Sequence, residues 1–291
     1  MRRERSASPG SILVRGCPQG CYPWSFVTGN PQSSDELTRR LTLPRYPRSA
    51  RYDARWAIEN QMGPHALWLL EWLAPALGLD RLPPGARVLD LGCGRAMTSV
   101  FLAREYGVQV VAADLWVRPE ENAVRIAEAG LADQVLPMRA EAHELPFGDG
   151  SFDAIVSVDA YQYFGTDDLC LPQLTRLLKP GGRIGVVVPS LREELEGTEP
   201  PASLAAHWEP AYWCFHSPAW WRRNWTRTGA VTVEAADWLE DGAREWLLWS
   251  EVCAEKSPSE FMRGLARDCV NLLNADEDEL LGFARIVGVR A

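Results

Sequence analysis

The stretch VLDLGCGRA, residues 88–96, decides the fold that the sequence predicts. Apolar residues typical of a short strand run directly into a turn that contains Gly92 and Gly94. Glycine lets the backbone approach a ligand closely, and a helix after the turn offers free N–H groups at its start. Asp90 adds a carboxylate, which suits an ammonium or sulfonium group better than a pyrophosphate. The stretch therefore predicts a strand–turn–helix unit that binds a nucleotide-like ligand with a cationic portion.

From Arg87 onward, short apolar runs alternate with amphipathic segments. Strands are predicted at 87–91, 108–114, 134–139, 153–158 and 183–188. Helices are predicted between them, at 97–105, 120–129 and 169–178. Two later segments alternate like strands that complete the sheet, at 231–236 and 282–289. This order indicates an α/β protein with a Rossmann-like, doubly wound, mostly parallel seven-stranded sheet.

The chain divides into an arm and one principal domain. Residues 1–50 are rich in Pro, Ser, Gly and Arg and have no sustained period, which predicts a disordered or loosely packed arm. Residues 51–291 are expected to form the domain, with 51–84 as an N-terminal helical cover. A long aromatic-rich insertion, 191–228, precedes the last two strands, and insertions of this length are usually lids or binding loops. We therefore expect a C-terminal lid.

Composition narrows the class of partner. The net charge of −9 disfavours a nucleic-acid substrate, because phosphate binding needs a basic surface. No apolar run reaches the roughly eighteen residues of a membrane-spanning helix, and no signal peptide is evident, so a cytoplasmic protein without a membrane partner is expected. The seven scattered cysteines predict reduced thiols. Cys17 and Cys21 have no further ligands at zinc spacing, so no metal site is expected.

Four motifs in order, between Arg87 and Val188, resemble those of the class I S-adenosylmethionine-dependent methyltransferases. The glycine turn matches the first motif, with Ala96 in place of the usual third glycine. Asp114 ends the second predicted strand at the family's acidic position. The segment EAHELPF (141–147) resembles the family's D-A-x-x-L-P-F, and LLKPGG (177–182) resembles its turn into the fifth strand.

The resemblance implies S-adenosylmethionine as cofactor and a small molecule as methyl acceptor. The sequences DLW (114–116) and FHSP (215–218) are most similar to bacterial small-molecule members, often labelled as ubiquinone or cyclopropane-fatty-acid enzymes. In this family the residue at Asp114 accepts hydrogen bonds from both ribose hydroxyls, and those at Glu141 and Ala142 read the adenine edge. The cofactor-binding residues that the resemblance implies are Asp90, Gly92, Gly94, Asp114, Leu115, Glu141, Ala142 and Asp159.

Candidates for the acceptor side come from the expected lid and from the fourth strand. A hydroxyl acceptor needs a base within reach whose pKa lies near the operating pH, and His216 in the lid is such a group. Ligands of open α/β sheets bind outside the carboxyl ends of the strands, which is where Asp159, Tyr161 and Tyr163 follow the fourth strand. One of the two tyrosines is expected in the core. The catalytic candidates are therefore His216, Tyr161 and Asp159.

Two other functional classes remain open. A nucleotide-dependent oxidoreductase of the NAD type would need the G-x-G-x-x-G fingerprint, in which Met97 occupies the third glycine position. A non-catalytic cofactor-binding protein on the same fold would bind the cofactor without turnover. The acidic residues Asp90, Asp114 and Glu141 favour an enzyme. The sequence leaves open the identity of the acceptor, whether oxygen, nitrogen or carbon is methylated, and the oligomeric state.

Overall fold

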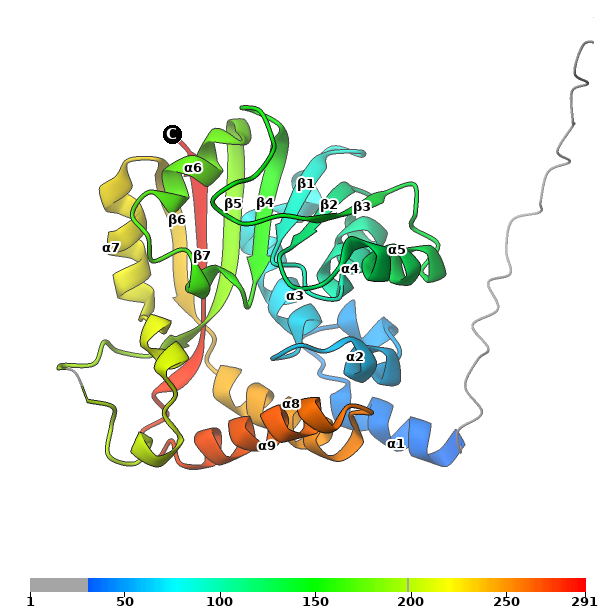
Figure 1. The fold of residues 1–291 in the computed structure, drawn as a ribbon, viewed down its shortest axis with the longest axis vertical. Helices are drawn as coiled ribbons and strands as arrows, with labels where there is room; N and C mark the ends of the chain where they lie inside the picture. The colour runs from blue at the N-terminus through cyan, green and yellow to red at the C-terminus, as the bar shows by residue number, and fades with distance from the viewer. Residues whose placement is uncertain (1–30, 198) are drawn as a thin grey trace, which may run out of the picture.

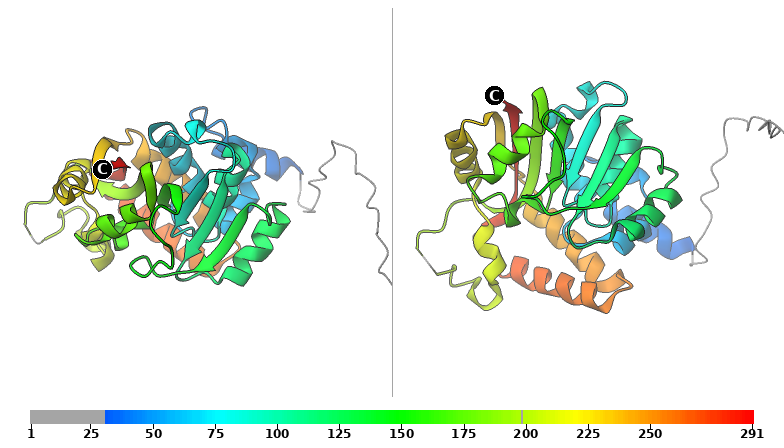
Figure 2. Two further views of the ribbon diagram at one scale, coloured as in Figure 1. Left: turned by 90° about the horizontal axis from the view of Figure 1, so that it is seen from above. Right: turned by 45° about the horizontal axis from the view of Figure 1, so that its top comes forward.

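A computed structural model describes residues 31–291 except residue 198, and its centre is one seven-stranded sheet (Figures 1 and 2). The strand order is β3-β2-β1-β4-β5-β7-β6, and β7 alone runs antiparallel to its neighbours. The predicted Rossmann-like, mostly parallel sheet is confirmed. The strands are β1 (Arg87–Leu91), β2 (Gln109–Asp114), β3 (Val135–Arg139), β4 (Phe152–Val158), β5 (Leu178–Leu191), β6 (Val231–Trp238) and β7 (Leu281–Arg290).

Helices cover both faces of the sheet. Alternate strand residues point to opposite faces, so Val88 and Leu89 belong to two different core clusters. Helices α3, α4 and α8 contribute to the first cluster, and α6 and α7 to the second. The helices are α1 (Pro31–Leu41), α2 (Ala54–Asn60), α3 (Ala66–Leu77), α4 (Met97–Tyr106), α5 (Pro119–Glu128), α6 (Cys170–Arg176), α7 (Pro218–Thr228), α8 (Gly242–Lys256) and α9 (Glu260–Asn274).

Strand β5 is longer than the segment 183–188 that the sequence predicts. It extends beyond that segment at both ends, and β7 pairs with it over nine residues, from Arg183 opposite Val289 to Leu191 opposite Leu281. The last three residues of β5 are strand because β7, from the other end of the chain, provides their hydrogen-bonding partners. This long pair lies between β4 and β6 in the sheet.

The expectation of a loosely packed arm over 1–50 is wrong for residues 31–50; residues 1–30 lie outside the described part. Leu37 and Leu41 of α1 are buried in the first core cluster. Tyr46 is also buried, and its ring stacks on Trp68 of α3 at a centroid distance of 5.9 Å. A polar helix with two leucines gives a weak sequence signal, but the apolar surface of the domain supplies a partner for them.

The expected lid over 191–228 is corrected in its second half. Helix α7 forms the crossover to β6 and packs against the sheet, with Trp221 and Trp225 fully buried. The first half contains two short 3₁₀ turns, Ala205–His207 and Pro210–Cys214. Helices α8 and α9, which the sequence analysis did not predict, lie below the sheet in Figure 1 together with α1. The indole N–H of Trp249 in α8 donates to the Gly63 carbonyl at 2.9 Å.

None of the helices in the described part of the chain has both the length and the apolar character needed to cross a bilayer. The cysteines that the structure describes, Cys93, Cys170, Cys214, Cys253 and Cys269, are all free thiols.

Glu71 of α3 joins the N-terminal segment to the domain. Its carboxylate accepts hydrogen bonds from the backbone N–H groups of Arg48 and Ser49, at 2.8 and 2.7 Å, and from the Ser49 hydroxyl at 2.6 Å. We expect Glu71→Ala to lower the free energy of unfolding by about 2 kcal/mol, because partly buried donors lose their acceptor. Urea unfolding measures this, with Glu193→Ala as the exposed control. Equal effects of the two substitutions would contradict the joining role.

Gly92, directly after β1, adopts φ +76°, and a Cβ built on it would lie 2.3 Å from the Ala160 Cβ. Gly130 adopts a similar φ of +71°, but no atom lies within 4 Å of its added Cβ. Alanine at either position costs about 1 kcal/mol for the left-handed backbone. We expect Gly92→Ala to lower the free energy of unfolding by about 1–3 kcal/mol more than Gly130→Ala does, because the added methyl group also clashes with Ala160. Urea unfolding of both variants tests this, and equal losses would disprove the close approach.

Candidate functional site

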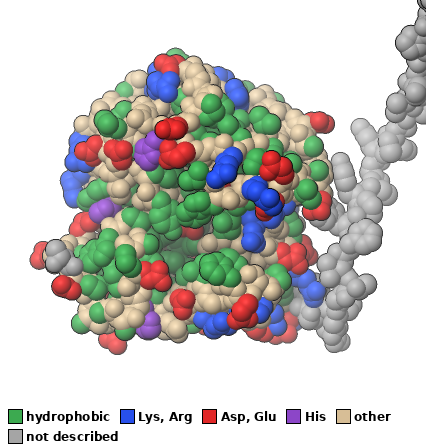
Figure 3. All heavy atoms as spheres, in the orientation of Figure 1, with side chains coloured by type: hydrophobic (Ala, Val, Ile, Leu, Met, Phe, Trp, Pro, Cys, Tyr) green, Lys and Arg blue, Asp and Glu red, His purple; other side chains and the backbone are tan. Residues whose placement is uncertain are grey.

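A cavity of about 310 Å³ lies where β1, β2 and β4 end. Leu91, Asp114 and Val158, at the carboxyl ends of these strands, line it, as does Asp159 immediately after β4. Figure 3 shows a hollow bordered by hydrophobic side chains near the centre of this face of the molecule. The parallel arrangement of the three strands brings their ends to one edge, the usual ligand site of this fold class.

Asp114 organises the loops at the end of β1 and β2. One carboxylate oxygen accepts the Gly94 N–H at 2.8 Å, and the other accepts the N–H groups of Trp116 and Val117, each at 2.8 Å. Asp114 is 8% exposed and lines the cavity, together with Gly92, Gly94 and Leu115. Four of the residues that the sequence singled out for the cofactor are therefore brought together. These three bonds use three of the roughly four lone-pair sites of the carboxylate, and the oxygen that accepts the Gly94 N–H retains one.

Asp90 lies beneath the site and does not line the cavity. Its side chain is completely buried, and one oxygen accepts the hydroxyls of Thr98 and Ser99 at 2.6 Å each. Burial raises the pKa of Asp90 to about 6, against the lowering effect of these hydrogen bonds. Thr98, at the start of α4, does line the cavity. The expected direct contact of Asp90 with a ligand is thus replaced by support of the α4 N-terminus, which follows β1 after the five loop residues 92–96.

Glu141, Ala142 and His143 form the next wall of the cavity. The Glu141 carboxylate contacts the His143 ring Nδ1 at 2.8 Å and accepts the His143 backbone N–H at 2.9 Å. The hydrogen bond to His143 holds the pKa of Glu141 below its usual value. The segment that resembles the adenine motif therefore faces the same cavity as Asp114.

Asp159 enters the cavity from the end of β4 in a strained conformation. Its φ is +55°, which is uncommon for a residue other than glycine and is often found at functional sites. The carboxylate accepts a hydrogen bond from the Gln162 side chain at 3.2 Å. Burial raises the pKa of Asp159 to about 7. Gly63 lies against the other oxygen, since a Cβ added there would come within 2.2 Å of it.

Tyr161 and His216 are not among the residues that line the cavity. Tyr161 is fully buried, with ring-centroid distances of 5.6 and 5.7 Å to Trp221 and Trp225. His216 stacks on Trp220 at 3.7 Å and contacts Glu194 at 3.1 Å. The structure therefore does not bring these two catalytic candidates into the cavity.

The two tyrosines after β4 diverge because Tyr161–Tyr163 is a 3₁₀ turn. This confirms that one tyrosine of the pair belongs to the core. Tyr163, 55% exposed, lines the cavity instead of Tyr161.

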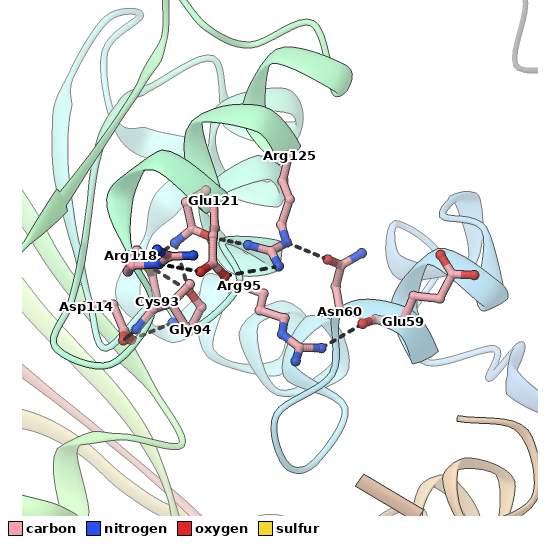
Figure 4. Close-up of polar contacts among 11 residues, drawn as sticks. Glu59, Asn60, Cys93, Gly94, Arg95, Asp114, Arg118, Glu121 and Arg125 are labelled. Carbon is pink, nitrogen blue, oxygen red and sulfur yellow. Dashed lines mark hydrogen bonds and ion pairs between the residues drawn. The ribbon is translucent and has the colours of Figure 1, made fainter. Parts of the chain in front are cut away.

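Sequence reasoning missed the cover formed by the α2–α3 connection. Asn60, Met62 and Gly63 line the cavity, although no motif marks them. Two arginines hold this segment, as Figure 4 shows: Arg95 donates to the Glu59 carbonyl at 2.8 Å, and Arg125 donates to the Asn60 side chain at 3.1 Å. The sequence indicated this segment only through the expected N-terminal helical cover over 51–84, without naming the residues that contact the cavity. Among the described residues, no cluster of three or more His, Cys, Asp or Glu side chains is arranged to hold a metal.

Comparisons with known proteins agree with this geometry. Residues 88–182 match a family model described as a methyltransferase domain. The 2-methyl-6-phytyl-1,4-hydroquinone methyltransferase of Synechocystis is 32% identical over 186 residues, which cover 60% of this chain and 57% of that protein. The chain thus spans little more than half the length of the first curated relatives it matches.

Solved structures share the fold at lower identity. The geranyl diphosphate C-methyltransferase of Streptomyces coelicolor, solved with S-adenosyl-L-homocysteine, aligns with a TM-score of 0.58 and 18% identity, covering 91% of this chain and all of that one. The cyclase SpnF aligns with a TM-score of 0.55 and 19% identity, covering 75% and 79%. Because this fold occurs in enzymes with different names, the fold by itself does not give the reaction. The matched domain over 88–182, the sheet order and the glycine turn together support the resemblance to the class I S-adenosylmethionine-dependent methyltransferases.

Proposed function

We propose that this chain binds S-adenosylmethionine in the cavity and transfers its methyl group to a small-molecule acceptor by in-line displacement. The observation that carries the proposal is the convergence of Asp114, the glycine turn and the 141–143 segment on one cavity. A carboxylate beside a glycine turn fits a ligand that has both ribose hydroxyls and a cationic amino-acid portion.

Different residues of the cavity are assigned to the ribose and to the adenine of the cofactor. Asp114 accepts hydrogen bonds from the ribose hydroxyls, and Glu141 with the Ala142 amide holds the adenine edge. Leu115 and Trp116 are 44% and 72% exposed at the rim, where large apolar side chains offer a face to a flat ring. Gly92 leaves room for close approach, and Thr98 marks the start of α4, where backbone N–H groups are free.

The main contribution of the protein to methyl transfer is to hold the cofactor and the acceptor in the correct relative orientation. When bound, S-adenosylmethionine supplies an activated methyl group, and its sulfur keeps the electron pair of the broken carbon–sulfur bond. Asp159 takes the proton that the acceptor atom loses as it forms its bond to the methyl carbon. Its pKa of about 7 suits this task, because a general base works best with a pKa near the operating pH. Asp159 therefore replaces His216 as the proton acceptor.

The competing functions predict different ligands. The glycine turn has Met97 at the third position of the dinucleotide fingerprint, which disfavours an oxidoreductase. A non-catalytic protein would bind S-adenosylmethionine and give no turnover. The acceptor belongs to the small molecules, since the net charge of −9 disfavours nucleic acid.

Calorimetric titration with S-adenosylmethionine, S-adenosylhomocysteine and NADH tests the cofactor. We expect both adenosyl ligands to bind and NADH not to bind. Asp114→Ala should weaken S-adenosylmethionine binding by about 2 kcal/mol, because charged hydrogen bonds are lost. Asp133→Ala, which removes an exposed carboxylate, is the matched control. Unchanged affinity in Asp114→Ala, or binding of NADH alone, would reject the assignment.

The role of Asp159 is tested by turnover, measured as S-adenosylhomocysteine formed with a small-molecule extract of the producing cells. We expect Asp159→Asn to lower turnover about 100-fold, since general-base catalysis contributes on this order. Its affinity for S-adenosylhomocysteine, which lacks the sulfonium charge, should be retained. The wild-type rate should rise with pH through about 7, because only the ionised carboxylate accepts a proton.

His216→Ala is the control for Asp159→Asn, and it should keep both turnover and cofactor affinity because its ring lies outside the cavity. A full rate in Asp159→Asn, or a wild-type rate that falls as the pH rises through 7, would remove Asp159 from the mechanism.

A further inference from the structure

The charges around the cavity are unevenly distributed. Among the described residues that line it, the carboxylates are Asp114, Glu141 and Asp159, and the cationic or titratable nitrogen groups are Arg95 and His143. Arg95 follows the glycine turn and donates to the Glu59 carbonyl (Figure 4), and His143 is paired with Glu141. The end of the cavity at Asp159 is thus left with a carboxylate and no paired cation in the described part of the chain.

The groups close to Asp159 are neutral side chains from three separate elements. Tyr163 lies in the 3₁₀ turn after β4, Cys214 in the 3₁₀ turn before α7, and Cys269 in α9. Burial raises the pKa of Tyr163 to about 12, that of Cys214 to about 11 and that of Cys269 to about 12. The nearby negative charge of Asp159 also contributes to the raised pKa of each group. Gln162 donates a side-chain hydrogen bond to Asp159.

More distant groups add negative charge. Asp268 in α9 and Glu209 both act on Cys269, and both raise its pKa. The negative charges of the same two carboxylates also raise the pKa of Tyr212, which lies in the same turn as Cys214. The named groups at this end of the cavity are therefore negative or neutral, and a second anion placed beside Asp159 would be repelled by its carboxylate.

The rim beside Asp159 is apolar. Met62 is 38% exposed and Tyr163 is 55% exposed, and the Trp116 ring lies 6.2 Å from that of Tyr163. All three side chains line the cavity. Exposed apolar side chains around a cavity favour a ligand with an apolar body.

We propose that Asp159 selects the acceptor by charge: the acceptor has an apolar body and a hydroxyl or amino group that donates to Asp159, and carboxylate or phosphate acceptors are excluded. This inference rests on the proposed function, because it assigns the acceptor class of the same cavity. Like charges about 4 Å apart in a partly buried site repel strongly enough to weaken binding by about 100-fold or more. A donor meets the carboxylate with a charge-assisted hydrogen bond instead.

Three probes of matched shape and different charge test the proposal: benzyl alcohol, benzylamine and benzoate. Their dissociation constants are measured by ligand-observed NMR at pH 8 on protein saturated with S-adenosylhomocysteine. We expect the alcohol or the amine to bind at least about 100-fold more tightly than benzoate. The ratio of alcohol to amine affinity tells whether the donor is neutral or cationic.

Two variants assign the selection to Asp159. In Asp159→Asn the preference against benzoate should fall to less than about tenfold, since the repelling charge is gone. Asp133→Asn removes an exposed carboxylate that is not among the groups around Asp159 and should keep the wild-type preference. Binding of benzoate as tightly as the other probes, an unchanged preference in Asp159→Asn, or binding of none of the probes would overturn the proposal. Calorimetry with S-adenosylhomocysteine on the same samples separates these results from failure of the proposed function, which would abolish cofactor binding itself.

Discussion

The Asp114 carboxylate accepts three backbone hydrogen bonds from two different loops, and the site depends on this arrangement. One bond fixes Gly94 in the turn after β1, and the other two fix the loop after β2. The two loops meet because β1 and β2 are parallel neighbours, with Leu91 opposite Ala113. A side chain that satisfies buried N–H groups of both loops holds the cavity wall in place without help from a ligand. The oxygen that accepts the Gly94 N–H retains acceptor capacity for a ligand in the cavity.

The region of the site also contains two carboxyl groups, Asp90 and Asp159, whose hydrogen bonds do not fully offset the cost of burying their charge. Burial raises the pKa of Asp90 to about 6 and that of Asp159 to about 7. A raised pKa means that the folded protein holds the proton more tightly than the unfolded chain. The stability that each group contributes is therefore present at low pH and is lost as the pH rises through these values. A cationic ligand offsets this loss, so the same carboxyls that destabilise the free protein favour the complex.

The surroundings of Asp159 come from widely separated parts of the chain. Gly63 lies between α2 and α3, Cys214 precedes α7, and Cys269 belongs to α9. The Trp249 hydrogen bond to Gly63 joins the N-terminal cover to α8. In this arrangement the ends of β1, β2 and β4 and the connection between α2 and α3 line the cavity.

The sequence by itself determined the sheet and the cofactor wall. Strand periodicity and the glycine turn act over neighbouring residues. The alternation of β1 to β5, the positions of Asp114 and Glu141 at its loops, and a mostly parallel seven-stranded sheet were therefore predictable. Tertiary structure decided what depends on distant partners. The packing of 31–50, the helices α8 and α9, and the burial of Tyr161 against Trp221 and Trp225 follow from contacts between segments far apart in the chain. His216 had a suitable residue type for a base, but its stacking on Trp220 removes it from the cavity. Side-chain chemistry can be read locally, whereas which side chains share a cavity is fixed by long-range packing.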